Sequence, residues 1–167
     1  MSSVTNNSHE TDRVVALRLA EIVRSLPAPE GTRYPYELVT FTDKVAFVAG
    51  QISKQNGELS HTGKVGLDVS AKDAAQSARI CAQQALAWLN HSAGGLSNLD
   101  RILRLTCYVA HDDTFEDISA VADGASHYFN ETLGDQGRHV RAVIGVKSLP
   151  RNAPVLIEVT ATLIAPP

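Results

Sequence analysis

The sequence predicts an α+β fold in which two long helices cover one face of a single mixed β-sheet. Apolar residues recur at helical or strand spacing in the order helix, strand, strand, helix, strand, helix, strand, strand. No internal repeat divides the chain, and its 167 residues match the size of one domain. This order of elements is typical of two-layer α+β architectures.

Composition and charge exclude several classes of protein. Hydrophobic residues make up 44% of the chain, which is too many for a disordered protein. The 15 basic and 18 acidic residues give a net charge of −3, without the basic excess of nucleic-acid-binding proteins. Two cysteines cannot form a disulfide scaffold, and the sequence contains neither an apolar leader nor a membrane-spanning apolar run. We therefore expect a soluble cytoplasmic protein that binds neither nucleic acid nor a membrane.

The composition of residues 1–33 changes along their length. Residues 1–12 are polar and without apolar period, which predicts a disordered arm. Residues 13–33 are expected to form a helix, stopped by Pro27 and Pro29, and a proline-rich connector. Residues 34–167 then form the single folded domain.

Each element of that domain has its own signal. A hairpin is predicted at 38–41 and 45–49, around a three-residue turn. Ser70 and Asp73 form a capping box that opens an alanine-rich helix, whose small side chains allow close packing on a sheet. The remaining predicted elements are a strand at 102–110 with Leu103, Leu105, Cys107 and Val109 on one face, a helix at about 114–132 that Asp112 and Asp113 begin, and strands at 139–147 and 155–164.

Alternation along the last two strands assigns their faces. Val140, Ala142, Ile144 and Val146 make one apolar face, and the odd residues from Val155 to Leu163 make another, so both are expected to meet the helices. The opposite face is mixed in polarity. A second subunit could cover it, or water could.

Arg141 is the strongest candidate binding residue from pattern alone. A mid-strand arginine among small and apolar neighbours presents a fork that fits a carboxylate, although an ion pair with Glu158 would also explain it. His139 and Arg138 are expected at the rim. Tyr36 follows Pro35 on the connector, where it would form a pocket wall or simply pack over the sheet edge.

Other chemistry-bearing residues carry weaker signals. The six histidines show no metal-binding spacing, so no metal and no cofactor are expected. Cys81 and Cys107 fall on apolar stripes, which predicts buried, inert thiols. The nucleophile-elbow, P-loop and dinucleotide-binding motifs are absent from the sequence.

A set of short motifs, taken in order, resembles the RidA (YjgF) family, also called the endoribonuclease L-PSP or reactive-intermediate-deaminase family. These motifs lie between about Tyr34 and Ala165: Phe47-Val48-Ala49-Gly50-Gln51, Thr62-Gly63-Lys64-Val65-Gly66, Arg104-Leu105-Thr106, Gly137-Arg138-His139-Val140-Arg141, Leu149-Pro150 and Ile157-Glu158. The longer N-terminal helix is similar to that of a chorismate-mutase-like branch of the family.

The resemblance implies a chorismate-mutase-like fold and a homotrimer with a barrel-like core and ligand clefts between subunits. In deaminating members an arginine eight residues before a Leu-Pro pair holds the substrate carboxylate, and Arg141 matches that position. Tyr36 matches a tyrosine of the ligand site, and Gly50 matches a glycine whose backbone lies beside the ligand. On this basis Arg141 and Glu158 are the candidate catalytic residues, with Arg141, Tyr36 and Gly50 binding substrate.

Two positions depart from the deaminating members. Leu156 stands where they carry a water-positioning glutamate, and leucine can neither hold water nor take a proton. The asparagine that those members carry in their second helix is also missing, and Ala122 or Asp123 stands in its region.

These observations leave two hypotheses. In the first, the trimer binds a small carboxylate at Arg141, unneutralised by its own chain, and hydrolyses 2-imino or enamino acids to 2-oxo acids and ammonia. In the second, the same cleft binds a small carboxylate without catalysis. Ribonuclease activity is disfavoured by the net charge of −3 and the lack of a basic stripe.

Overall fold

The computed structural model describes residues 4–167, and the side chains of residues 13–167. Its α-helices are α1 (Val4–Ser25), α2 (Ala71–Ser92) and α3 (Ile118–Leu133). Its strands are β1 (Val39–Thr42), β2 (Val45–Ile52), β3 (Lys54–Gln55), β4 (Glu58–Leu59), β5 (Leu99–Ala110), β6 (Val140–Val146) and β7 (Val155–Leu163). Single turns of 3₁₀-helix lie at Leu96–Asn98, Gly134–Gly137 and Pro150–Asn152.

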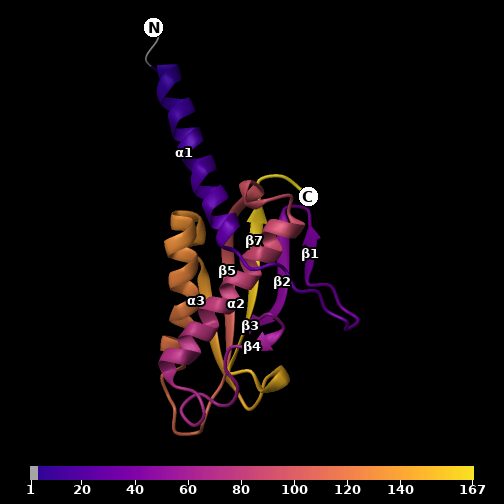
Figure 1. Ribbon diagram of the computed structural model, residues 1–167, viewed down its shortest axis with the longest axis vertical. Coiled ribbons are helices and arrows are strands. Elements are labelled where there is room, and N and C mark those ends of the chain that lie inside the picture. Colours follow the sequence, from indigo (N-terminus) through magenta and orange to yellow (C-terminus); the bar gives the residue numbers. More distant parts are fainter. Residues whose placement is uncertain (1–3) are drawn as a thin grey trace.

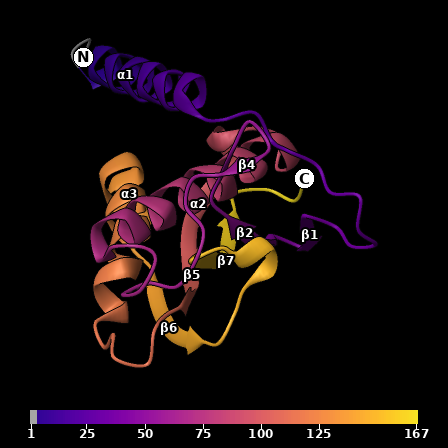
Figure 2. The ribbon, with the colours of Figure 1, turned by 60° about the horizontal axis from the view of Figure 1, so that its bottom comes forward.

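Five of the strands form one mixed sheet in the order β1-β2-β7-β5-β6. The β5–β6 pair is parallel, with α3 as its crossover, and the other pairs are antiparallel. Helices α2 and α3 pack side by side on one face of the sheet, while β1 and β6 form its opposite edges (Figures 1 and 2). The predicted α+β class and its layer arrangement are confirmed. Strands β3 and β4 form a separate small hairpin that the sequence did not predict.

The core lies between the sheet and the two helices. The alanine stripe of α2 is buried, and it lets α3 approach so closely that a Cβ built on Gly124 would lie 1.9 Å from the carbonyl oxygen of Ala75. Glycine at that position is therefore required by helix packing. Ser70 caps α2 as predicted, since its Oγ accepts from the Asp73 backbone N–H at 3.1 Å.

The two faces of the sheet confirm the prediction for β7 and correct the prediction for β6. On β7 the odd residues from Val155 to Leu163 are buried under the helices, as expected. On β6 the prediction was wrong: Arg141 and Val143 face the helices, and the apolar Val140 and Ile144 lie on the open face, 67% and 42% exposed. β6 is an edge strand, and α3 covers its helix-facing side only in part. The more apolar side of this strand is therefore not the side that is buried.

Strand β5 differs from its prediction for a different reason. A register irregularity between Ile102 and Arg104 interrupts the simple alternation. Ile102 is consequently buried, and Leu103, predicted on the buried face, is 37% exposed. A bulge of this kind shifts every residue on one side of it to the other face.

Two helix starts also differ from prediction. Helix α1 extends back to Val4, through residues 4–12 that we expected to be a disordered arm, while residues 1–3 of that arm lie outside the described range. In the part of this helix from residue 13 onward, Leu19 and Ile22 pack against the body, and Arg18 Nη2 donates to the carbonyl oxygens of Glu131 and Thr132 at 3.4 Å. The N-terminal part of the helix projects beyond the body (Figure 1). Helix α3 begins at Ile118 with Asp117 as its cap, whereas Asp112 holds the preceding turn through Thr114. No helix in residues 4–167 is long and apolar enough to cross a lipid bilayer.

Candidate functional site

Arg141 lies on the edge strand β6 and points toward α3. Its Nη1 donates to Asp123 Oδ1 at 2.7 Å and to Ser126 Oγ at 3.1 Å. The expectation that its own chain leaves this charge unneutralised was therefore wrong. The alternative pairing with Glu158 was wrong as well, because Glu158 lies on the opposite face of the sheet.

The guanidinium of Arg141 is nevertheless only partly used. Both bonds leave from Nη1, and no acceptor among residues 13–167 bonds Nη2 or Nε. A guanidinium has five N–H donors in a planar fork, so one edge of this fork is available to a ligand. The Arg141 and Asp123 side chains are 25% and 48% exposed, and ion pairs this open to water contribute about 0–1 kcal/mol.

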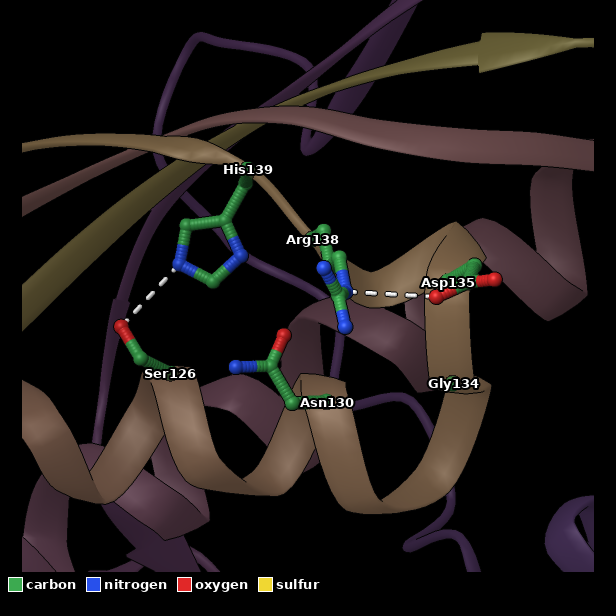
Figure 3. A pocket seen from close by; sticks show the side chains of 6 residues that line it. All are labelled: Ser126, Asn130, Gly134, Asp135, Arg138 and His139. Atoms are coloured by element: carbon green, nitrogen blue, oxygen red, sulfur yellow. Dashed lines mark hydrogen bonds and ion pairs between the residues drawn. The ribbon is translucent and has the colours of Figure 1, made fainter.

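Ser126 and His139 extend this polar cluster. Ser126 Oγ lies 3.0 Å from His139 Nε2, and His139 Nδ1 lies 2.6 Å from the carbonyl oxygen of Gly137. The two side chains line a cavity of about 450 Å³ together with Asn130, Gly134, Asp135 and Arg138 (Figure 3). From the sequence we expected His139 at the rim, and Ser126 and Asn130 were not predicted as site residues. Their i, i+4 spacing puts both on one face of α3.

Glu158 occupies a different environment, on the open face of the central strand β7. Its carboxylate accepts a hydrogen bond from the Tyr108 hydroxyl at 3.1 Å. Burial raises the pKa of the Tyr108 phenol, and the neighbouring charge of Glu158 raises that pKa further. Glu158 and Arg141 therefore cannot contact the same small ligand within one subunit.

Gly50 and Leu156 lie against each other on the same open face. A Cβ built on Gly50 would lie 2.7 Å from Leu156 Cδ2, so the absence of a side chain at Gly50 makes room for the leucine. The hydrocarbon side chain of Leu156 therefore lies beside the Gly50 backbone, at the position where the resemblance implies a glutamate in deaminating members.

Tyr36 lies at the far edge of the sheet from Arg141. It precedes β1, is 51% exposed, and stacks on Tyr34 with ring centroids 6.4 Å apart. Four strand spacings separate β1 from β6, which is roughly 19 Å at about 4.8 Å per spacing. The predicted site residues are thus spread across the sheet within one subunit.

Both cysteines are buried in the core, as predicted. Burial raises the pKa of the Cys107 thiol to about 12 and also raises that of Cys81, so both are protonated at neutral pH. Among the side chains of residues 13–167, no three His, Cys, Asp or Glu residues gather as a metal site.

Comparison with known proteins places this geometry in a family. Residues 12–163 match the family model described as "YjgF/chorismate mutase-like, putative endoribonuclease". Protein TCP17 of Trypanosoma cruzi is 29% identical over 150 residues, covering 89% of this chain and 94% of that protein.

Two solved structures are similar over most of their length. Atu1372 from Agrobacterium tumefaciens, described as of unknown function, is 35% identical with a TM-score of 0.78, covering 87% of this chain and 91% of its own. A putative endoribonuclease from Shewanella oneidensis is 26% identical with a TM-score of 0.82, covering 89% and 98%. These matches confirm the predicted resemblance, and the chain belongs to the YjgF/chorismate mutase-like family.

Proposed function

We propose that this protein binds a small carboxylate, such as a 2-oxo acid, at the unused edge of the Arg141 guanidinium. The cleft is completed by a neighbouring subunit of a homotrimer, as the family resemblance implies. The observation that carries the proposal is the half-used guanidinium: Nη1 is held by Asp123 and Ser126, which orients the fork, while Nη2 and Nε have no acceptor among residues 13–167. A fork held in this way is suited to bidentate binding of a carboxylate.

The spread of the candidate residues supports a site between subunits. Arg141 lies at one edge of the sheet, and Tyr36 and Gly50 lie at or next to the other edge. They could contact one small ligand only if the β6 edge of one subunit approaches the β1–β2 edge of another. The cleft would then contain contributions from both subunits.

The open face of the sheet supports assembly independently. It carries four large apolar side chains that are 37–67% exposed, distributed over three strands: Phe47, Leu103, Val140 and Ile144. An apolar face of this kind in a single chain is a usual mark of an interface.

A thermal-shift titration with pyruvate and 2-oxobutyrate tests the binding proposal. At ligand concentrations about 100-fold above Kd, binding stabilises the folded state by about 2.7 kcal/mol, which raises the Tm by roughly 5–10 °C. Arg141→Ala should abolish that rise. Arg79→Ala is the matched control, because Arg79 forms a similar ion pair with Glu131 at 2.9 Å, and it should keep the rise. A rise that persists in Arg141→Ala, or its absence from the wild type, would contradict the proposal.

Hydrolysis of 2-imino acids is the second candidate function. The family resemblance favours it, whereas the hydrocarbon contact of Leu156 with Gly50 leaves no proton acceptor at that point of the cleft. A coupled assay that generates 2-aminoacrylate in solution separates the two functions. Ligand-induced stabilisation without acceleration over buffer identifies a binding protein, and acceleration lost in Arg141→Ala identifies the hydrolase.

A further inference from the structure

We infer that Ser126 is an activated nucleophilic hydroxyl, and that the cavity beside it is a site for hydrolysis of small anionic esters. This inference does not depend on carboxylate binding by the unused edge of Arg141. It rests on a directed chain of hydrogen bonds, on the position of Ser126 at the cavity wall, and on the donors that face it.

The directions of the hydrogen bonds follow from the chemistry at the two ends of the chain. Arg141 Nη1 can only donate, and the Gly137 carbonyl can only accept. In neutral His139 the Nδ1 therefore carries the proton and Nε2 accepts. Because Ser126 Oγ lies 3.0 Å from that Nε2, its own proton is directed at the imidazole.

This arrangement activates the hydroxyl from two sides. His139 is placed to take the proton as Ser126 reacts, and the Arg141 cation, 3.1 Å from Oγ, stabilises the negative charge that develops there. Ser126 is half-buried and lines the open cavity of about 450 Å³, so a small ligand can reach it (Figure 3).

The other residues of the cavity indicate the class of substrate. Asn130, one helical turn after Ser126, supplies an amide donor for the oxygen of a reacting carbonyl group. Arg138 forms another wall, and its side chain is 78% exposed. Among residues 13–167 its guanidinium makes one ion pair, from Nε to Asp135 Oδ1 at 3.2 Å. A small ester that carries a negatively charged group matches this combination of nucleophile, amide and cation.

The reaction balances without any further reagent. Ser126 Oγ attacks the ester carbonyl carbon while its proton passes to His139 Nε2. The bond from that carbon to the alcohol oxygen breaks, and the alcohol leaves with the proton. Water then hydrolyses the acyl-serine by the same proton route, which releases a carboxylic acid and restores Ser126.

A second Ser–His pair in the same chain provides an internal comparison. Ser77 Oγ lies 2.9 Å from His61 Nδ1, but Ser77 is 0% exposed and also lies 3.3 Å from Ser60 Oγ. No arginine bonds Ser77 among residues 13–167. Ser77 therefore has the hydrogen bond to histidine, but a substrate cannot reach its hydroxyl and no cation stabilises a charge on it. We expect Ser77 to be unreactive.

The test uses a fluorophosphonate probe with the wild-type protein, followed by intact-mass measurement and peptide mapping. We expect one adduct per chain, on Ser126, and none on Ser77. The His139→Gln variant should react about 100-fold more slowly, since a general base typically contributes at least this factor. The His61→Gln variant is the matched control and should react at the wild-type rate.

Several results would overturn the inference. These are no adduct on the wild type, an adduct on another residue, or equal rates for the wild type and His139→Gln. The wild-type measurement does not depend on whether any variant folds. Carboxylate-induced stabilisation of the wild type, measured without the probe, reports on the proposed function alone. Adduct formation on Ser126 reports on this inference alone, so the two proposals can fail separately.

Discussion

Polar residues on the two faces of the five-stranded sheet have different surroundings. On the helix-covered face, Arg141, Ser126 and His139 form a connected cluster beside a cavity. On the open face, Glu158 has one hydrogen-bond partner within residues 13–167, Tyr108, and the surrounding residues include large exposed apolar side chains. We propose ligand binding on the first face and subunit contact on the second.

This difference explains why residues that the sequence grouped together are separated in space. Arg141 and Glu158 belong to strands of one sheet, yet their side chains leave it on opposite sides. A strand position fixes the face only when the register and the covering elements are known. The polar cluster on the helix side is instead completed by α3, through Asp123 and Ser126.

The largest expected effect compares one isoleucine from each face. Ile157, fully buried under the helices, should cost about 2–5 kcal/mol of unfolding free energy when changed to alanine. Ile144, 42% exposed on the open face, should cost about 1 kcal/mol or less in the single chain. Denaturant unfolding at low protein concentration measures both values. Equal costs would mean that the open face is as fully packed as the covered one.

The next effect concerns assembly through the open face. Val140→Glu places a charge on this face, where Val140 is 67% exposed, and should dissociate the proposed trimer. Light scattering should then report a mass near 17.9 kDa in place of three times that value, about 54 kDa. Leu17→Glu, at a residue 59% exposed on α1, is the control and should leave the mass unchanged. A wild-type mass near 17.9 kDa would mean that the protein is a monomer, and it would contradict the proposed interface on the open face.

The sequence predicted the layers of the fold more fully than it predicted the site. The capping box at Ser70, the alanine stripe of α2 and the buried face of β7 are local patterns, and each was found where expected. The Asp123 and Ser126 contacts to Arg141 join residues 15–18 positions apart, across the crossover from α3 to β6. Such contacts depend on where α3 lies along the sheet, which no periodicity in the sequence encodes.

A smaller effect tests how strongly the covered face neutralises Arg141. Asp123→Asn removes the negative charge 2.7 Å from Nη1 and should strengthen carboxylate binding by up to about fivefold, because a solvent-exposed ion pair is worth about 0–1 kcal/mol. Isothermal titration with pyruvate measures this change. Glu131→Gln, which removes the partner of Arg79, is the matched control and should have no effect. Weaker binding by Asp123→Asn would show that the Asp123 charge strengthens binding by holding the guanidinium in place more than it weakens binding by neutralising it.

The smallest effect belongs to the open face and depends on pH. The folded-state pKa of Tyr108 is raised, first by burial and then by Glu158, above the value of about 10 for a free phenol. The folded protein therefore holds this proton more tightly than the unfolded chain does. Its contribution to stability is fully present below about pH 10 and is lost as the pH rises through the folded-state pKa.

Unfolding free energies measured between about pH 8 and 11 should therefore fall more steeply for the wild type than for Tyr108→Phe. Tyr128 has a raised pKa from burial as well, so the difference between these two proteins, and not either curve alone, isolates Tyr108. Glu158→Gln should reduce this difference without removing it, because burial is the larger cause. If Glu158→Gln removed the difference entirely, the charge of Glu158 and not burial would raise the pKa of Tyr108, and the phenol would be less enclosed than we infer.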